Sequence, residues 1–172
     1  MSDPQLEFTN VTALIPEAVG EPGQRMFRLV VNSGTSSGIL WLEKEQLFQL
    51  ALAINQLVAT LPDVQARVSD VLEAREAPPS THLEFKVEKL VLGYETNLGR
   101  FIIDTHDVEA ADEAPTLRLW GTPSLMKKLA EEALQVCAAG RPLCPLCGNP
   151  IDKTGHKCAR SNGHGIVDLR NI

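Results

Sequence analysis

The spacing of apolar residues changes along the chain from the alternation of strands to the period of an amphipathic helix. Apolar runs predict a strand over residues 26–31 and its return over residues 39–42, with a Gly/Ser-rich turn between them. Leu6 and Phe8 are consistent with an earlier, starting strand. A helix then runs up to Pro62, which stops it, and its predicted buried stripe is Leu47, Leu50, Ala51, Ile54, Leu57, Val58 and Leu61.

Three further strands and a second helix are predicted in the later part of the chain. Apolar and charged residues alternate over 83–88, and two more strand-like segments follow at 99–104 and 116–120, which indicates a meander. The Thr-Pro pair at 122–123 offers an N-cap hydroxyl and a first-turn proline, so we expect a helix from there to Gly140. This order predicts an α+β fold, an antiparallel β-sheet with two main helices on one face.

The composition is that of an ordinary globular protein. The chain has 172 residues, 44% of them apolar and 22% charged, which suits one domain with a small appendage. No apolar run approaches the roughly 20 residues that cross a bilayer, and the N-terminus lacks the basic and apolar blocks of a signal peptide. We therefore expect a cytoplasmic protein without membrane contact, where clustered cysteines more often hold a metal than form a disulfide.

Charge is distributed unevenly along the chain. The net charge of −6 argues against a protein that coats nucleic acid, because phosphate binding requires local cationic density. From Arg141 onward, however, five Lys or Arg face two Asp, a local charge of +3. A weak nucleic-acid contact through this basic tail and a solvated metal loop both fit the pattern, and we favour the solvated loop.

The clearest chemical pattern is a set of metal ligands near the C-terminus. Cys144 and Cys147 are spaced so that both thiolates of one tight turn can reach the same ion, and His156 and Cys158 follow on an extended segment. Three Cys and one His are a tetrahedral ligand set for Zn²⁺. His164 is an alternative fourth ligand, since its Gly-containing loop is flexible enough to reach back. We prefer His156, because residues 155–158 form a compact second knuckle.

The predicted zinc is structural. Three cysteines donate much charge to the ion and lower its Lewis acidity, and no Glu follows Arg141 to act as a base. About thirty residues are too few to build a core, so the metal would replace the missing apolar burial. We therefore expect an α+β domain over 1–140 and a zinc-ribbon-like knuckle over 141–172.

Two segments near the C-terminus resemble a known signature. Residues 139–152, Ala-Gly-Arg-Pro-Leu-Cys-Pro-Leu-Cys-Gly-Asn-Pro-Ile-Asp, and residues 155–163, Gly-His-Lys-Cys-Ala-Arg-Ser-Asn-Gly, are similar to the C-terminal motif of an uncharacterised bacterial protein family, a domain of unknown function. The resemblance extends over nearly the whole chain. It includes the Glu-Pro-Gly-Gln-Arg turn at 21–25 and the Leu-Glu-Lys-Glu-Gln helix start at 42–46.

The resemblance refines the site and leaves the activity open. Family sequences usually carry Pro where this chain has Ala159, a difference that affects the stiffness of the knuckle more than its ligands. The family motif implies His156 rather than His164 as a ligand, because it ends in Asn-Gly without always supplying another His. It implies no known activity.

Asp104 and His106 are a second candidate site. Asp104 and His106 lie two residues apart on a predicted strand and share a face, so the carboxylate could orient the imidazole for base catalysis or metal binding. The alternative is a solvated strand end beside an acidic loop, which we favour. The chain contains no P-loop, dinucleotide-binding, Gly-x-Ser-x-Gly or His-Glu-x-x-His motif.

Three functional hypotheses follow from these patterns. The first is a non-enzymatic zinc-binding adaptor whose body binds a protein partner. The second is a nucleic-acid-associated zinc knuckle, in which phosphates would meet the basic residues Lys153, Lys157, Arg160 and Arg170. The third is a hydrolase-type enzyme centred on Asp104 and His106.

Overall fold

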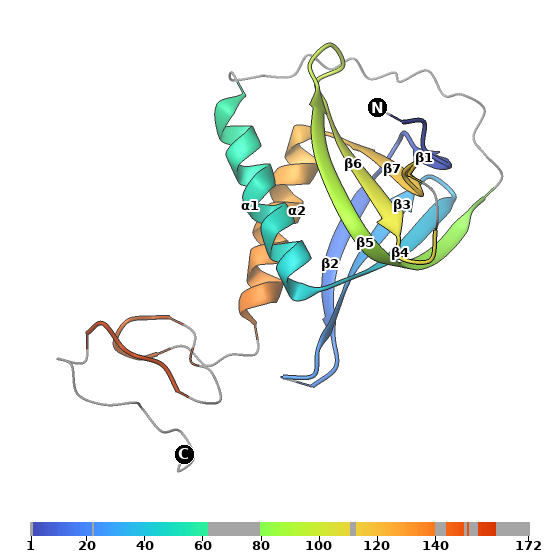
Figure 1. Cartoon of the computed structure of the whole chain (residues 1–172). Coiled ribbons are helices and arrows are strands. Elements are labelled where there is room, and N and C mark those ends of the chain that lie inside the picture. The colour runs from blue at the N-terminus through green and yellow to red at the C-terminus, as the bar shows by residue number, and fades with distance from the viewer. Residues whose placement is uncertain are drawn as a thin grey trace. The chain divides into compact units, whose positions relative to one another are not determined.

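The computed structural model divides the chain into two compact units, Met1–Cys137 and Ala138–Ile172 (Figure 1). Each unit is described by itself below. The residues that the structure describes are 2–21, 23–61, 80–110, 113–139, 144–149, 151 and 155–160. Among these residues, no helix is both long enough and apolar enough to cross a bilayer.

The first unit combines one sheet with two helices. The seven strands lie in the order β1-β7-β6-β5-β4-β3-β2. Their bounds are β1 Leu6–Phe8, β2 Ala13–Val19, β3 Met26–Ser33, β4 Ser36–Leu42, β5 His82–Glu95, β6 Arg100–Asp107 and β7 Leu117–Gly121. The helices are α1 Lys44–Thr60 and α2 Pro123–Ala138. The predicted α+β class and the predicted order of strands, helix, three strands and helix are confirmed.

The sheet is mostly antiparallel, as predicted, but two of its six pairings are parallel. The segments β2–β3–β4 and β5–β6–β7 are antiparallel meanders, whereas β4 pairs with β5 and β1 with β7 in parallel. The first parallel pair arises because α1 lies between β4 and β5 in the sequence. The chain leaves the sheet at the end of β4 and returns to start β5 in the same direction, a crossover that parallel strands require.

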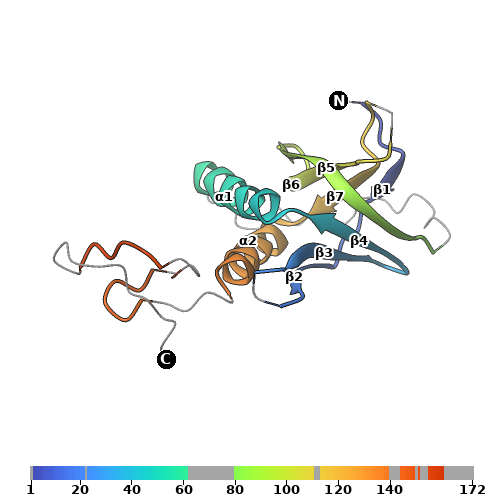
Figure 2. The same cartoon turned by 60° about the horizontal axis from the view of Figure 1, so that its bottom comes forward.

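Both helices lie on the same face of the sheet (Figures 1 and 2). Alternate strand residues such as Leu29, Leu40 and Phe101 point to that face and are buried against the helix residues Leu47 and Met126 in one continuous core. Where α2 ends, the Sγ of Cys137 lies 3.9 Å from the backbone oxygen of Lys44 at the start of α1. The two helices are therefore antiparallel neighbours, and the predicted arrangement is confirmed.

Side chains at the helix starts explain where each helix begins. The Gln46 side-chain oxygen accepts a hydrogen bond of 2.8 Å from the backbone N–H of Glu43, half of a reciprocal capping box. At α2, the Thr122 hydroxyl accepts a hydrogen bond of 3.2 Å from the backbone N–H of Leu125. This is the N-cap predicted from the Thr-Pro pair.

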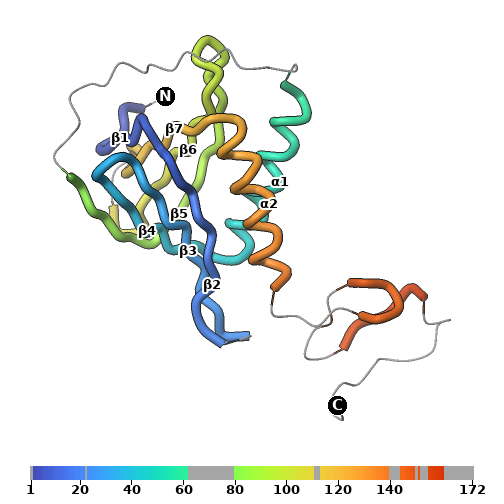
Figure 3. Tube along the Cα trace, turned by 180° about the vertical axis from the view of Figure 1, so that it is seen from behind, coloured from blue at the N-terminus to red at the C-terminus, as the bar shows by residue number. Residues whose placement is uncertain are grey.

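The second strand, β2, is the element that the sequence pattern did not predict. It contains Pro16, which cannot donate to a ladder of backbone hydrogen bonds and is therefore unusual in a central strand. The structure places β2 at the edge of the sheet, where one side has no partner strand (Figure 3). An edge position tolerates the proline, so Pro16 and the strand are compatible.

Candidate metal centre

The first two cysteines lie in a tight turn held by backbone hydrogen bonds. The N–H of Gly148 donates to the carbonyl oxygen of Cys144, and the N–H of Cys144 donates to the carbonyl oxygen of Asn149, both at 2.8 Å. Gly148 has φ of 72°, a left-handed conformation that favours glycine. The turn therefore brings Cys144 and Cys147 to one side of the chain, as the Cys-x-x-Cys spacing predicts.

The second half of the cluster lies on residues 155–158. Gly155 also has positive φ, at 89°, and leads into a short extended stretch. His156 and Cys158 are two residues apart on this stretch, so their side chains point to the same side. Ile151 is 3% exposed and packs with the cysteines of the cluster.

The four side chains meet in an arrangement that fits a tetrahedral ion. The Sγ atoms of Cys144 and Cys158 are 3.7 Å apart, and Cys147 Sγ is 3.3 Å from His156 Nε2. All four ligand atoms lie within 4.8 Å of one another. Bond lengths of about 2.3 Å to sulfur and about 2.0 Å to nitrogen place tetrahedral ligands at separations of roughly 3.5 to 3.8 Å. The Cys144–Cys158 and Cys147–His156 separations are close to these values, so the cluster could hold a metal ion.

Burial and hydrogen bonding shift the pKa values of the Cys144 and Cys158 thiols in opposite directions. Cys144 and Cys158 are buried, whereas Cys147 and His156 are half-buried. The backbone N–H of Cys147 donates to the Cys144 sulfur and lowers the pKa of that thiol. Burial raises the pKa of the Cys158 thiol. Deprotonated thiols bind metal, so the N–H that faces Cys144 prepares one ligand even before an ion is bound.

The two ring nitrogens of His156 lie in different surroundings. Its Nε2 faces Cys147, while its buried Nδ1 has no hydrogen-bond partner among the described residues. An Nε2 ligand leaves the remaining proton on Nδ1. Bound imidazoles usually donate that proton to a carbonyl or carboxylate, a contact that the described residues do not make here.

The structure brings together the four residues proposed as ligands, Cys144, Cys147, His156 and Cys158. None of them takes part in a disulfide. His164 lies outside the described residues, so the choice between it and His156 stays a prediction. Of the four basic residues assigned to phosphate contacts, Lys157 and Arg160 are described and exposed, whereas Lys153 and Arg170 lie outside the described residues.

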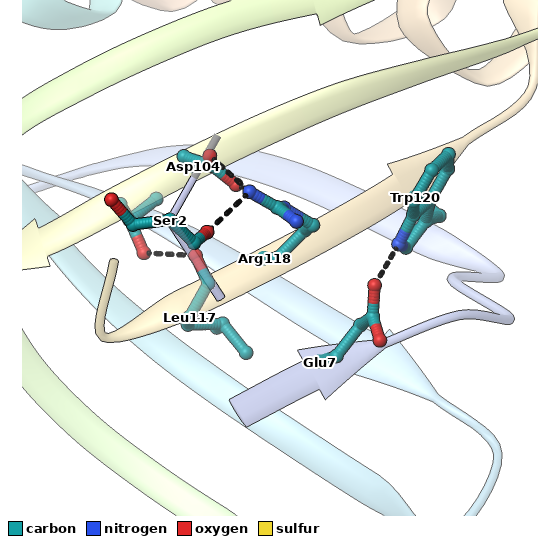
Figure 4. A network of polar contacts seen from close by, with 7 residues as sticks. Ser2, Glu7, Asp104, Leu117, Arg118 and Trp120 are labelled. Carbon is teal, nitrogen blue, oxygen red and sulfur yellow. Dashed lines mark hydrogen bonds and ion pairs between the residues drawn. The ribbon is translucent and has the colours of Figure 1, made fainter. Parts of the chain in front are cut away.

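The favoured interpretation of Asp104 and His106, a solvated strand end, is wrong for Asp104, which is 5% exposed, whereas His106 is half-buried. Both carboxylate oxygens of Asp104 accept hydrogen bonds from Arg118, from Nε at 2.7 Å and from Nη2 at 2.8 Å (Figure 4). The side-chain hydrogen bond with Asp104 raises the pKa of Arg118. Asp104 therefore forms a buried ion pair with Arg118, and the carboxylate is directed to the guanidinium.

This ion pair belongs to a network that the sequence patterns did not predict. Arg118 Nη2 also donates to the backbone oxygen of Ser2 at 3.2 Å, and on the same strand Trp120 Nε1 donates to the Glu7 carboxylate (Figure 4). One signal was present on β7, where Arg118 interrupts an otherwise apolar strand. A single charge in such a strand indicates a partner of opposite sign on a neighbouring strand.

Comparison with known proteins gives one match. A family model described as "Protein of unknown function (DUF3090)" matches residues 6–158, which include the sheet, both helices and the four proposed ligands. No curated protein and no solved structure matches the chain.

Proposed function

Because the chain belongs to the DUF3090 family of proteins of unknown function, we propose its role from the geometry of the cluster. It is a non-enzymatic interaction protein in which a structural Zn²⁺ holds the C-terminal unit. The observation that carries this proposal is the set of four ligand atoms within 4.8 Å of one another. The cytoplasm, where thiols stay reduced, is the compartment that suits it.

The donor set supports zinc as the metal. Thiolate and imidazole ligands in tetrahedral geometry suit Zn²⁺, whereas Mg²⁺ and Ca²⁺ take oxygen ligands. Three cysteines and one histidine also complete the coordination of a structural zinc site. A catalytic zinc keeps one position open for water or substrate, and these four protein ligands leave none.

A structural role also suits the small size of the C-terminal unit. The buried apolar cluster described in it consists of Cys144, Ile151 and Cys158, with Cys147 packed against them. Such a cluster is too small to hold a fold through apolar burial, so metal binding would supply the missing free energy of folding. The zinc thus shapes this unit and performs no reaction.

Helix α1 supports a protein partner for the body of the molecule. From Gln46 to Thr60 it carries no charged side chain, although Phe48 is 36% exposed and Leu52 is partly exposed. Solvent-facing helix surfaces normally carry charges, and the neighbouring α2 does, at Lys127, Lys128, Glu131 and Glu132. The uncharged outward face of α1 therefore suits an uncharged protein surface.

The nucleic-acid alternative has less support. No Phe, Trp or Tyr follows Trp120, so the C-terminal unit lacks the large aromatic rings on which bases stack best. Lys157 and Arg160 are exposed and could contact phosphates, but Arg160 Nη1 lies 3.4 Å from the backbone oxygen of Leu146, a neighbour in its own unit. A protein partner is thus the better-supported candidate.

Metal analysis of purified protein tests the proposed zinc. The wild-type chain is expected to hold one zinc per molecule, and Cys158→Ser to lose it. Cys137→Ser is the matched control, because Cys137 is a buried cysteine of α2 outside the cluster. Replacement of the metal by Co²⁺ should give the absorption of a tetrahedral thiolate complex. A wild-type chain without stoichiometric zinc, or equal loss in both variants, would contradict the proposal.

A further inference from the structure

Two of the three cysteine sulfurs in the cluster are already in contact. Cys144 Sγ and Cys158 Sγ are 3.7 Å apart, and both residues are almost fully buried, at 3% and 6% exposed. A disulfide requires about 2.05 Å between its sulfurs. The two atoms would need to approach by a little under 2 Å, a small movement for side chains held on two separate segments.

The third sulfur of the cluster is that of Cys147. It lies 3.3 Å from His156 Nε2 and also interacts with the sulfurs of Cys144 and Cys158. Cys144 and Cys147 lie on one tight turn, which is held by the hydrogen bonds of Gly148 and Asn149 at 2.8 Å. Cys158 approaches from a different segment, and its 3.7 Å contact is the observation that favours pairing with Cys144.

We propose that this pair is a covalent modification site for small hydroperoxides, which join Cys144 to Cys158 and release the metal. This inference rests on the proposed zinc site and adds its regulation. Cys147 and His156 are the more exposed members of the cluster, so a small oxidant reaches the sulfurs past them. Oxidised glutathione, a bulky disulfide, does not reach Cys144 or Cys158, because both are buried.

The reaction balances with hydrogen peroxide as the oxidant. One thiolate attacks a peroxide oxygen, the O–O bond breaks, and a sulfenic acid and hydroxide form. The second thiolate attacks the sulfenyl sulfur, so the S–S bond forms and a second hydroxide leaves. Two protons convert both hydroxides to water, and the two electrons that reduce the peroxide come from the two sulfurs.

Loss of metal follows from the loss of ligands. The thiolate form of cysteine is the metal ligand, and a disulfide has no thiolate. Only Cys147 and His156 would remain, half of the ligand set that a structural zinc requires. Oxidation would therefore remove the constraint that folds the C-terminal unit, and reduction would restore it.

The experiment treats the zinc-loaded full-length protein with a small excess of hydrogen peroxide. We expect zinc to appear in solution, detected by a chromophoric chelator, while the intact mass falls by two hydrogens. Peptide mapping without reductant should show Cys144 joined to Cys158, and a thiol reductant should restore zinc binding. Cys137→Ser should behave as the wild type, and oxidised glutathione at equal concentration should form no mixed disulfide with Cys144 or Cys158.

The outcomes separate this inference from the proposed function. Zinc absent from the untreated protein contradicts the proposed function. Zinc present before treatment and retained after it, or released with sulfinic acids instead of a disulfide, contradicts the inference alone. A disulfide that includes Cys147 overturns the pairing read from the 3.7 Å contact.

Discussion

At the residue scale, two ion pairs with the same Nε–oxygen distance differ in how much water reaches them. Arg118 Nε is 2.7 Å from an oxygen of Asp104, with side chains 9% and 7% exposed, and Arg28 Nε is 2.7 Å from an oxygen of Glu17, with side chains 30% and 39% exposed. Water screens the second pair and contributes little to solvating the first. Loss of one partner therefore leaves an uncompensated charge only in the Asp104–Arg118 pair.

Replacing Asp104 tests this difference. Asp104→Ala is expected to lower the free energy of unfolding by about 3–5 kcal/mol, because the buried guanidinium of Arg118 would lose its carboxylate counter-ion. The matched variant Glu17→Ala should cost no more than about 1 kcal/mol. Urea unfolding at neutral pH measures both. Equal losses in the two variants would show that burial does not determine how much each ion pair contributes to the free energy of unfolding.

A close approach between sheet and helix gives a second prediction. A Cβ at Gly121, the last residue of β7, would overlap Met126 Cε, and Met126 is fully buried. Gly121→Ala must therefore displace the flexible end of a core side chain, at an expected cost of about 1 kcal/mol in stability, the low end for overpacking.

Gly93→Ala serves as the control for that variant. Its Cβ would meet only Ile102 at 3.9 Å, an ordinary contact, so thermal unfolding should change much less. A melting temperature that falls equally in both variants would mean that the loss of glycine itself, rather than the overlap with Met126, decides the effect.

The sequence predicted which side chains lie together where those residues are close to each other along the chain. Cys144 and Cys147 share one turn and His156 and Cys158 one extended stretch, so spacing alone showed that each pair could face one ion. The Asp104–Arg118 pair depends on the register that places these residues opposite each other on β6 and β7. Fourteen residues of sequence separate them, and no periodicity in the sequence reveals that register.

At the element scale, α1 gives a prediction about the partner. Phe48→Glu adds a charge to the uncharged face and should abolish co-purification of a bound protein, while the stability of the chain changes by no more than about 1 kcal/mol. Lys127→Glu, on the charged face of α2, should retain the bound protein. Capture from extracts of the native cell followed by mass spectrometry compares the three proteins.

Two results of that comparison would contradict the assignment of α1. One is recovery of the same protein with all three baits. The other is release of the bound material by nuclease, which would favour the nucleic-acid alternative and direct attention to Lys157 and Arg160.

Elements were predicted well where the hydrophobic pattern extends over many residues. Both helices have clear apolar stripes and recognisable starts, because capping depends on residues next to the helix. The strand β2 was not predicted, since Pro16 interrupts its pattern and edge position is a property of the whole sheet. The two parallel pairings also depend on distant segments, and alternation along a strand does not show the direction of its neighbour.

At the scale of the whole molecule, the two units are stabilised by different means. The unit Met1–Cys137 has one extensive apolar core, whereas the described apolar cluster of Ala138–Ile172 is small and centred on the proposed ligands. Removal of the metal should therefore unfold one unit and spare the other.

Chelation followed by hydrogen exchange measures this separation. Backbone amides of residues 144–149 and 155–160 should lose protection after zinc is removed, because the metal replaces core burial there. Amides of β3 and β6 should keep theirs, and the main thermal transition should not shift. Loss of protection across the sheet would show that the two units fold as one.

The parallel pair β1–β7 has a consequence for synthesis on the ribosome. It joins Leu6 to Leu117, so β1 leaves the ribosome well before the strand with which it pairs. At roughly 5–20 residues per second, β1 waits on the order of ten seconds for β7 to be made. During that interval the apolar face of the early strands has no complete sheet to join. Strand β1 therefore remains without its sheet neighbour until residues 117–121 have been made.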